Sequence, residues 1–536
     1  MAAKSPRDHG LRPPADELAP AGLGLRADAG ARLVAGGSVL VGGSPVRVLR
    51  LTPAGARAVA GWFSGAPVGD GVAARRLARR LLDVGIAHPD WGDRPRAGGS
   101  PGMDDVTVVI PVRDRNAELA RCLAGLRDVP NVIVVDDCSA DPAAIAAICA
   151  KHRARVVRRE VNGGPAAARN TGLAAVPTGL VAFLDSDCVP EPGWLQRLLP
   201  HFGDPAVGAV APRIVPHQEG TTWLGRYEGA SSTLDMGARP SIVRPGARVS
   251  YVPGAALVVR KAAAGAGFAA GMHVGEDVDF VRRMAAAGWR VRYEPAAVMG
   301  HDHRVRFRAW FSRRRDYGTS AAMLEQLHPG TVRPLYASWW TAGAWAAALS
   351  GRPVTAAALT GTATALLARR LSRVTGERWP LPAPAAPNAA APAPESSLPA
   401  DNSKRRAVAA ASPLAVRLGG GATAWPLAVR LAGGGTVGAA RPLGSALSRT
   451  WWPAAIAAAV AAPRLRLPVA ALILAPPLLD WADRRPPLDP ARYVAARLLD
   501  DAAYSLGVWQ GCLDRRTIRP LLPVFGNASG SRQEPR

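Results

Sequence analysis

The chain has 536 residues, of which 48% are hydrophobic, and a formal net charge of +25. This length exceeds one ordinary hydrophobic core and predicts two or three domains. A positive balance suits nucleic acid, an anionic membrane surface or a phosphorylated ligand. The basic residues are dispersed and no nucleic-acid module is evident, so we expect no nucleic acid and favour a membrane surface and a diphosphate ligand.

The cysteines and the first residues indicate the compartment. The five cysteines show no CxxC pairing, and several lie in apolar segments. They predict reduced thiols in a cytosolic setting. The opening residues MAAKSPRDHGLRPP lack an apolar core, so no signal peptide is expected.

Changes in composition divide the chain into a central α/β domain and two flanks. The expected segments are a disordered start (1–15), a winged-helix-like module (16–90), a linker (91–103), the α/β domain (104–330), an apolar helical region (331–375), a disordered linker (376–404), a helical region (405–520) and a disordered tail (521–536).

The N-terminal flank shows short apolar alternations over residues 25–51, where two glycine pairs predict hairpin turns. Thr52 is expected as a helix N-cap with Pro53 at the first position, and a second helix is expected over residues 72–82. Strands with two small helices favour a winged-helix-like module, which resembles the PqqD-type modules that bind precursor peptides. The alternative is an appendage that packs on the central domain.

Three apolar runs organise the central domain, at residues 106–110, 132–135 and 180–184. Such runs, rich in Val and Ile and bounded by turn formers, are typical of buried parallel strands. A helical pattern over residues 118–126 predicts a β-α-β unit. Because ligands of open parallel sheets bind past the carboxyl ends of the strands, the charged residues after each run are expected to gather at one rim.

Five motifs, in this order, resemble those of GT-A glycosyltransferases of family 2. They are IPVRDR, VVDDCSAD, NGGPAAARNTGL, FLDSDCVPEPGWL and GEDVDF. The resemblance covers roughly residues 104–320 and implies a Rossmann-like nucleotide-sugar-binding domain. With its flanks, the whole chain resembles the glycosyltransferases of the mycofactocin system.

Asp136 and Asp137 end the second strand. A carboxylate at the rim can accept the N–H of a base such as uracil. The resemblance implies that one of the pair binds the base, and Asp137 is our choice. The alternative is an N-cap for the next helix, although Ser139 or Asp141 can fill that role.

Further donor contacts are expected at Pro111 and Arg113, after the first strand, and at Gly164. This glycine lies in a turn before a helix expected over residues 166–173, and a helix N-terminus favours anions. Arg169 lies one turn into that helix and is expected to reach a diphosphate. An ion pair between Arg169 and a rim carboxylate is the alternative, and both roles are compatible.

Asp185 and Asp187 are expected to point the same way after the third strand, with Asp185 also at the donor site. Two hard oxygen ligands beside a diphosphate suit Mg²⁺ or Mn²⁺, which would neutralise the leaving group. His301, in MGHDHR, is expected to complete the metal shell or touch the diphosphate. A packed or solvated histidine is the alternative.

Glu276 and Asp277 begin a predicted helix. The resemblance implies that Asp277 is the general base that deprotonates the acceptor hydroxyl, with Glu276 beside it. The alternative is that both carboxylates only favour the helix N-terminus. Residues 250–260 predict a strand with a break at Pro253 and Gly254.

The motif FSRRRDYG supplies Arg314 and Arg315, which are expected to bind the diphosphate. Processive family members carry a Gln or Arg motif ending in Trp here. This chain lacks that Trp, which argues against an acceptor channel of the cellulose-synthase type.

The C-terminal flank contains Ala-rich apolar runs at residues 336–350, 354–368, 451–462 and 467–479. Each is shorter than the ~20 residues that span a bilayer, yet Trp at their edges and Arg outside suit a membrane interface. We expect a membrane-associated helical region, with a soluble helical appendage as the alternative. Residues 492–506 predict an amphipathic surface helix.

Together these features predict an inverting, metal-dependent glycosyltransferase. The resemblance implies UDP-glucose as donor and the peptide-derived redox cofactor mycofactocin as acceptor, extended to an oligosaccharide. One alternative is a membrane glycosyltransferase with a lipid or cell-wall acceptor. Another is an inactive peptide-binding scaffold, against which the intact acidic residues argue. The expected location is the cytoplasmic face of the membrane, or the cytoplasm.

Overall fold

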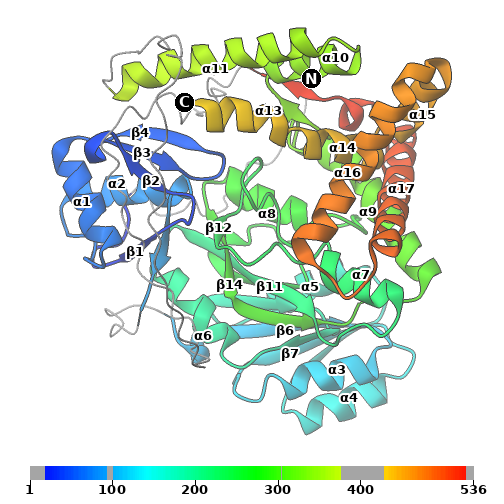
Figure 1. Ribbon diagram of the computed structural model, residues 1–536. Helices are drawn as coiled ribbons and strands as arrows, with labels where there is room; N and C mark the ends of the chain where they lie inside the picture. Colours follow the sequence, from blue (N-terminus) through cyan, green and yellow to red (C-terminus); the bar gives the residue numbers. More distant parts are fainter. Residues whose placement is uncertain (1–17, 93–100, 304, 376–427, 527–536) are drawn as a thin grey trace, which may run out of the picture.

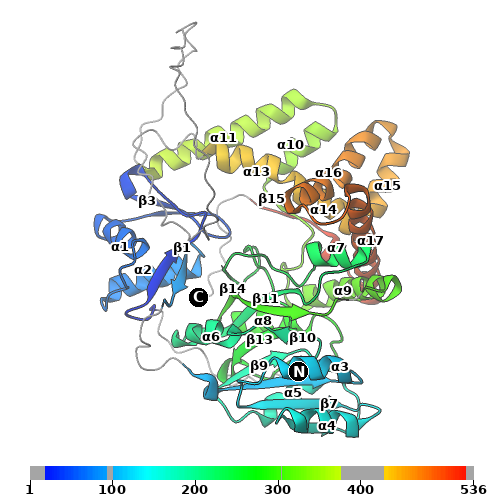
Figure 2. The ribbon, with the colours of Figure 1, turned by 60° about the horizontal axis from the view of Figure 1, so that its bottom comes forward.

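A computed structural model describes residues 18–92, 101–303, 305–375 and 428–526 (Figures 1 and 2). The expected disordered start, most of the first linker, the linker at 376–404 and the last ten residues of the tail lie outside this range. The described residues form a small N-terminal module, a central domain around a nine-stranded sheet, and a set of C-terminal helices.

The N-terminal module combines short antiparallel strands with two helices. Its elements are β1 (Gly24–Ala27), β2 (Arg32–Val34), β3 (Val39–Gly42), β4 (Arg47–Arg50), α1 (Pro53–Phe63), α2 (Val72–Asp83) and β5 (Ala87–Asp90). The order β2-β3-β4 forms one sheet, and β1 pairs with β5. As predicted, Thr52 caps α1, because its Oγ1 accepts the Gly55 N–H at 3.1 Å.

Ion pairs hold this module against the central domain. Arg79 of α2 donates to both carboxylate oxygens of Asp204 at 2.7 and 2.8 Å, and both side chains are buried. Arg290 makes a second such pair with Asp83 at 2.9 and 3.0 Å. Because separating a buried pair leaves charges without partners, these contacts oppose movement of the module.

The central sheet has the order β10-β14-β11-β13-β9-β6-β7-β8, with β12 paired to β14. Its strands are β6 (Val106–Val112), β7 (Val132–Asp137), β8 (Arg155–Arg159), β9 (Leu180–Leu184), β10 (Cys188–Pro190), β11 (Val207–Pro216), β12 (Ser241–Ile242), β13 (Ala256–Arg260) and β14 (Arg290–His301). Strands β6, β7 and β9 are parallel, as predicted, and β8 extends this parallel part, while β13 is antiparallel to both β9 and β11. A parallel Rossmann-like half therefore continues into a mixed half, which is the GT-A architecture.

Helices cover both faces of the sheet (Figure 1). They are α3 (Asn116–Ala124), α4 (Pro142–Lys151), α5 (Gly164–Ala175), α6 (Trp194–Leu198), α7 (Trp223–Ser231) and α8 (Glu276–Ala286). Alternate residues of β6 enter different cores: Val108 packs with Leu119 of α3, and Val109 packs in the core that contains Phe280 of α8. Burial on both faces explains why the strands are continuous apolar runs.

Two expectations about strands need correction. β8, with the sequence RVVRR, was not predicted, because its arginines hide the apolar pattern of an edge strand. The strand expected over residues 250–260 begins only at Ala256. Pro253 and Gly254 disfavour a regular strand, so residues 250–255 form a loop instead.

The C-terminal region is helical. Its elements are α9 (Phe307–Leu327), α10 (Trp339–Leu349), α11 (Pro353–Thr375), α13 (Gly434–Gly438), α14 (Ala440–Arg449), α15 (Trp452–Ala461), α16 (Arg466–Arg484) and α17 (Pro490–Asp514). The last segment returns to the first through β15 (Tyr336–Ala337), which pairs in parallel with β16 (Val524–Phe525). The start of the expected disordered tail is therefore ordered.

α17 packs closely against α9, which corrects the expectation of a surface helix over residues 492–506. A Cβ atom on Gly507 would lie 1.8 Å from the Arg315 carbonyl oxygen, and one on Gly318 would lie 2.1 Å from that of Tyr504. Only glycine permits this approach of the two backbones. The facing side of α17 is buried, including Asp500 and Ser505.

One helix among the described residues, Pro463–Arg484, is long and apolar enough to cross a membrane. It has 22 residues and a mean hydropathy of 1.4, and only 11% of its apolar window is buried. It is longer than the apolar run of residues 467–479 that the sequence pattern indicated, because it begins at Pro463 and continues to Arg484. The prolines within it, Pro476 and Pro477, do not end the helix.

Candidate active site

A cavity of about 690 Å³ lies between the rim of the sheet beyond β9 and the C-terminal helices. Its volume is within the range typical of small-molecule sites. The predicted site residues that line it are Arg169, Asp185, Asp187, Glu276, Asp277, His301 and Arg314. The predicted residues that do not line it are Pro111, Arg113, Asp136, Asp137, Gly164 and Arg315.

Asp277 is half-buried at the start of α8 and faces this cavity. Its Oδ2 accepts the N–H of Gly254 at 2.7 Å, and its Oδ1 accepts the N–H of Val278 at 2.8 Å. A carboxylate has about four lone-pair sites, so each oxygen retains one for a ligand. The two amides therefore hold the carboxylate in one orientation and leave it able to accept a proton.

Glu276 has a different environment. It is buried, and its Oε1 accepts from Nη1 of Arg169 at 2.9 Å. Burial and the adjacent charge of Asp277 raise the pKa of Glu276, although the Arg169 guanidinium opposes this. Its contacts make Glu276 a partner of Arg169, which leaves Asp277 as the more available base.

Arg169 connects three elements beneath the cavity. Besides Glu276 of α8, it donates from Nη2 to Oδ1 of Asp185, after β9, at 2.6 Å. Its side chain is only 3% exposed. This is the ion pair with a rim carboxylate that the sequence left open, and it fixes two site carboxylates relative to each other.

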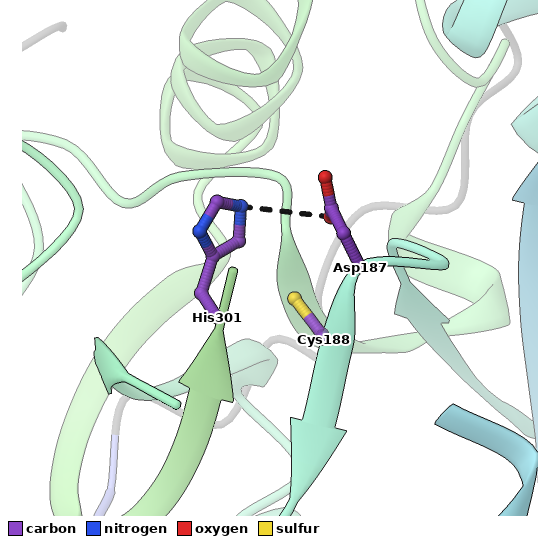
Figure 3. A group of neighbouring side chains, drawn as sticks. All are labelled: Asp187, Cys188 and His301. Carbon is purple, nitrogen blue, oxygen red and sulfur yellow. Dashed lines mark ion pairs between the residues drawn. The ribbon is translucent and has the colours of Figure 1, made fainter. Parts of the chain in front are cut away.

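Asp187 and His301 face each other across β10 and β14 (Figure 3). Their Nε2 and Oδ1 atoms are 3.5 Å apart, because the strand register places His301 opposite Cys188. Burial opposes ionisation of Asp187, but His301 and Arg115 outweigh it and lower the pKa of Asp187. The Asp187 carboxylate and the His301 imidazole thus lie as two neighbouring ligands of one metal ion would.

Cys188 lies within the same group but is a poor ligand. Its thiol is buried and donates towards the Ala255 carbonyl oxygen at 3.5 Å. Burial and the charges of Asp187 and Asp185 raise the pKa of Cys188 well above its usual value. A metal ligand must be a thiolate, so the fit is to Asp187 and His301 with Asp185 nearby.

The carboxylates at the end of β7 are engaged in the protein itself. Asp137 is buried, accepts the amide N–H groups of residues 163–164 at 3.0 and 2.7 Å, and pairs with Arg159 at 2.9 Å. Asp136 is buried as well. Asp141, and neither of this pair, caps α4. Asp137 therefore fastens the turn before α5, a role that the sequence did not indicate.

Three consecutive arginines of α9 have three different environments. Arg314 is buried and contacts Glu228 at 2.5 Å, Thr233 at 2.8 Å and Asp500 at 2.9 Å. These contacts occupy its guanidinium, which argues against the expected role of Arg314 in binding a diphosphate.

The neighbours of Arg314 differ from it. The side chain of Arg315 is 48% exposed and lies outside the cavity. Arg313 lines the cavity with its guanidinium 4.8 Å from the Tyr317 ring centroid, and its buried Nε has no hydrogen-bond partner among the described residues. Arg313 thus lines the cavity beside Arg314 and was missed by sequence reasoning.

Other residues of the site were also missed. Arg115, two positions after Arg113 in the motif IPVRDR, pairs with Asp187. Arg449 and Tyr504 come from α14 and α17 and line the far end of the cavity. The position of Arg115 in a recognisable motif was a usable signal, whereas nothing in the local sequence marks Arg449 or Tyr504.

Comparisons with known proteins agree with this geometry. Residues 107–264 match the model of the family described as glycosyl transferase family 2. The chain is 39% identical over 514 residues to the pre-mycofactocin glycosyltransferase of Mycobacterium tuberculosis (strain CDC 1551 / Oshkosh), covering 94% of this chain and 98% of the relative. It is 32% identical over 154 residues to the succinoglycan biosynthesis protein ExoO of Rhizobium meliloti (strain 1021), covering 27% and 43%.

Among solved structures, the chain is similar to the mannosyltransferase PcManGT from Pyrobaculum calidifontis in complex with GDP-Man and Mn²⁺. The identity is 22%, the TM-score is 0.34, and the match covers 53% of this chain and 88% of that chain.

Proposed function

Because the chain belongs to the family of pre-mycofactocin glycosyltransferases, we propose that it transfers glucose from UDP-glucose to a hydroxyl of a peptide-derived redox cofactor precursor. The observation that supports this most is one cavity that contains both Asp277 and the pair Asp187 and His301. A base for the acceptor and ligands for a donor-bound metal are thus brought to one site. Successive transfers would extend the product to an oligosaccharide.

The proposed reaction is a single displacement with inversion. Asp277 takes the proton from the acceptor hydroxyl, whose oxygen forms a bond to C1 of the sugar. The bond between C1 and the diphosphate oxygen breaks, and its electron pair leaves with the nucleoside diphosphate. The two amides on Asp277 orient the carboxylate for this proton transfer.

Mg²⁺ or Mn²⁺ fits Asp187 and His301, with Asp185 beside them. The metal would supply Lewis-acid stabilisation of the leaving diphosphate. Arg115 is the cation that pairs with Asp187 in the described structure. We assign Arg115 to the diphosphate in preference to Arg314.

A donor screen tests the proposal. Full-length protein, a divalent metal and the cofactor precursor are combined with each nucleotide sugar, and released nucleoside diphosphate is measured. We expect release with UDP-glucose that chelation abolishes. Asp277→Asn should bind nucleotide normally and lose ~10²–10⁴ in rate.

The outcomes separate the alternatives. Release that requires a lipid-linked acceptor favours the membrane glycosyltransferase. Absence of release with every donor favours the peptide-binding scaffold.

We also propose that the chain binds a membrane surface through α15 and α16. Apolar side chains on these helices are exposed, with Val460 at 70% and Leu467 at 84%. The candidate span ends at Arg484 and is followed by Arg485. Basic residues beside an apolar helix suit an anionic interface.

Flotation with phosphatidylglycerol vesicles tests this second proposal. Val460→Ser together with Leu467→Ser should reduce binding. Val161→Ser is the matched control, because Val161 is 73% exposed on the central domain. Equal flotation of all variants, or no flotation of the parent, would contradict the proposal.

A further inference from the structure

The cavity continues past Asp277 into a part that the sheet does not form. This far part is lined by the loop at Tyr251, by Arg313 and Tyr317 of α9, and by Arg449 and Tyr504 from the C-terminal helices. The central domain alone therefore supplies only part of the site. The opposite wall comes from segments that follow it in sequence.

Two stacked pairs of arginine and tyrosine characterise this wall. The Arg449 guanidinium carbon lies 4.4 Å from the ring centroid of Tyr504, and that of Arg313 lies 4.8 Å from the ring centroid of Tyr317. When a guanidinium stacks on a ring, its N–H groups lie in the guanidinium plane, parallel to the ring, and point outward from its edges. Such a pair presents flat surfaces together with donors at their edges.

Tyr251 adds a third ring near these pairs. Its hydroxyl donates to the Thr233 carbonyl oxygen at 3.2 Å. Burial raises the pKa of Tyr251 to about 12, against the charge of Arg449, so it remains a neutral phenol. The wall is therefore aromatic and cationic, and the same cavity contains the acidic residues Asp277 and Glu276.

The wall is held in place by the contacts of the C-terminal helices. Arg449 lies 3.5 Å from Asp501, which Arg497 and Ser448 also contact at 3.4 and 2.5 Å. Gly511 of α17 allows a similar close approach, since its Cβ would lie 2.5 Å from the Thr319 carbonyl oxygen of α9. These contacts fix Arg449 and its ring without requiring a ligand.

We propose that the pairs Arg449–Tyr504 and Arg313–Tyr317 form the acceptor subsite and select acceptors with a planar unsaturated ring that carries a carbonyl or carboxylate oxygen. The ring stacks against the tyrosines and guanidinium planes, and the arginine N–H groups donate to the oxygen. This arrangement places the far end of the acceptor against the C-terminal helices and its hydroxyl towards Asp277. The inference rests on the proposed function for the reaction itself, while the binding preference is independent of turnover.

A matched pair of small probes tests the preference for a planar ring. 4-Hydroxybenzoate and trans-4-hydroxycyclohexanecarboxylate carry the same hydroxyl and carboxylate, and only the first has a flat ring. Binding to full-length protein with UDP and Mg²⁺ is measured by ligand-observed NMR titration. We expect the flat probe to bind at least five-fold more tightly, and equal binding or no binding of either probe would overturn the proposal.

Two variants of α14 test the residues. Arg449→Gln should weaken binding of the flat probe at least five-fold, and Asp501 keeps its other two partners. Arg441→Gln is the control, because Arg441 is on the same helix, is paired with Asp483 at the surface and does not line the cavity. The same affinity in both variants would remove Arg449 from the subsite.

Tyr504 provides a second test that also monitors folding. Tyr504→Phe keeps the ring and should preserve binding, whereas Tyr504→Leu should reduce the preference for the flat probe. The melting temperature and UDP affinity of each variant report whether the fold and the donor end are intact. If the parent protein binds the flat probe but transfers no sugar, the proposed function fails and the subsite stands. If the parent protein transfers sugar but Arg449→Gln and Tyr504→Leu bind the probes as the parent does, only the subsite fails.

Discussion

Replacing Arg314 with methionine separates a structural role from a ligand-binding role for the arginines of α9. Methionine retains much of the apolar stem but leaves Glu228 and Asp500 without their counter-charge. These contacts are 2.5 and 2.9 Å, and all three side chains are at most 6% exposed. Burial raises the pKa of Glu228 against the charge of Arg314, so loss of the arginine favours a protonated Glu228. The same substitution removes the 2.9 Å contact that Arg314 makes with Asp500.

The expected loss of stability is large. Removing one partner from a buried ion pair costs about 3–5 kcal/mol. For a domain of about 150–250 residues this corresponds to a fall in melting temperature of roughly 6–20 °C. Arg315→Met is the adjacent control: its side chain is 48% exposed and its acidic neighbour is 4.0 Å away, so a change within about 0.5 kcal/mol is expected.

Thermal unfolding with and without UDP is the assay. The structural role predicts that Arg314→Met melts early, while the fraction that remains folded at low temperature binds UDP as the parent does. If Arg314→Met melts with the parent and loses UDP affinity, Arg314 is a ligand contact and the reasoning from its buried partners is wrong.

Three further outcomes follow from other contacts. Asp187→Asn should reduce transfer by at least ~10²-fold and abolish its dependence on Mn²⁺ without lowering the melting temperature, since it removes the charge of the proposed metal ligand; diphosphate release at parental rates would exclude that ligand. Gly507→Ala should lower the free energy of unfolding by about 1–3 kcal/mol or more, because the new methyl group would lie 1.8 Å from a carbonyl oxygen. The control Gly361→Ala in α11 places its methyl group in open space and should raise the free energy of unfolding by up to ~1 kcal/mol. Burial lowers the pKa of His201. Below about pH 6.5 the unfolded chain therefore takes up a proton that the folded chain resists, and the free energy of unfolding should fall as the pH drops. His201→Gln should flatten this pH dependence in melting curves between pH 7 and pH 5, and an unchanged slope would assign it to other groups.

The central sheet could be predicted from the sequence because the apolar pattern of its strands is local. Runs such as residues 106–110 are buried on both faces, and the acidic residues after them occupy positions that sheet topology brings to one rim. Thr52 and Asp141 were recognisable caps for the same reason, since a cap acts within three residues of itself. β8 was not predicted because its position at the edge of the sheet tolerates three arginines, which interrupt the apolar pattern.

The sequence says least about residues whose surroundings come from distant segments. Nothing near Arg314 in the sequence indicates that it will pair with Asp500. The environments of the three consecutive arginines depend on where α17 packs, and α17 itself resembled a surface helix because its buried face includes Asp500 and Asp501. Arg449 and Tyr504 meet Asp277 only through that same packing.

The contact between α17 and α9 has a consequence for how the protein is made. Synthesis proceeds from the N-terminus at ~5–20 residues per second, so Asp500 emerges roughly 10–40 seconds after Arg314. Until then Arg314 lacks Asp500, and Trp310 lacks the cover that Tyr493 and Ala496 give it in the finished chain. A nascent chain with this surface is suited to chaperone binding. A message cut before the codon for residue 490 would yield a protein that contains the proposed base and metal ligands but lacks Tyr504 and the rest of α17.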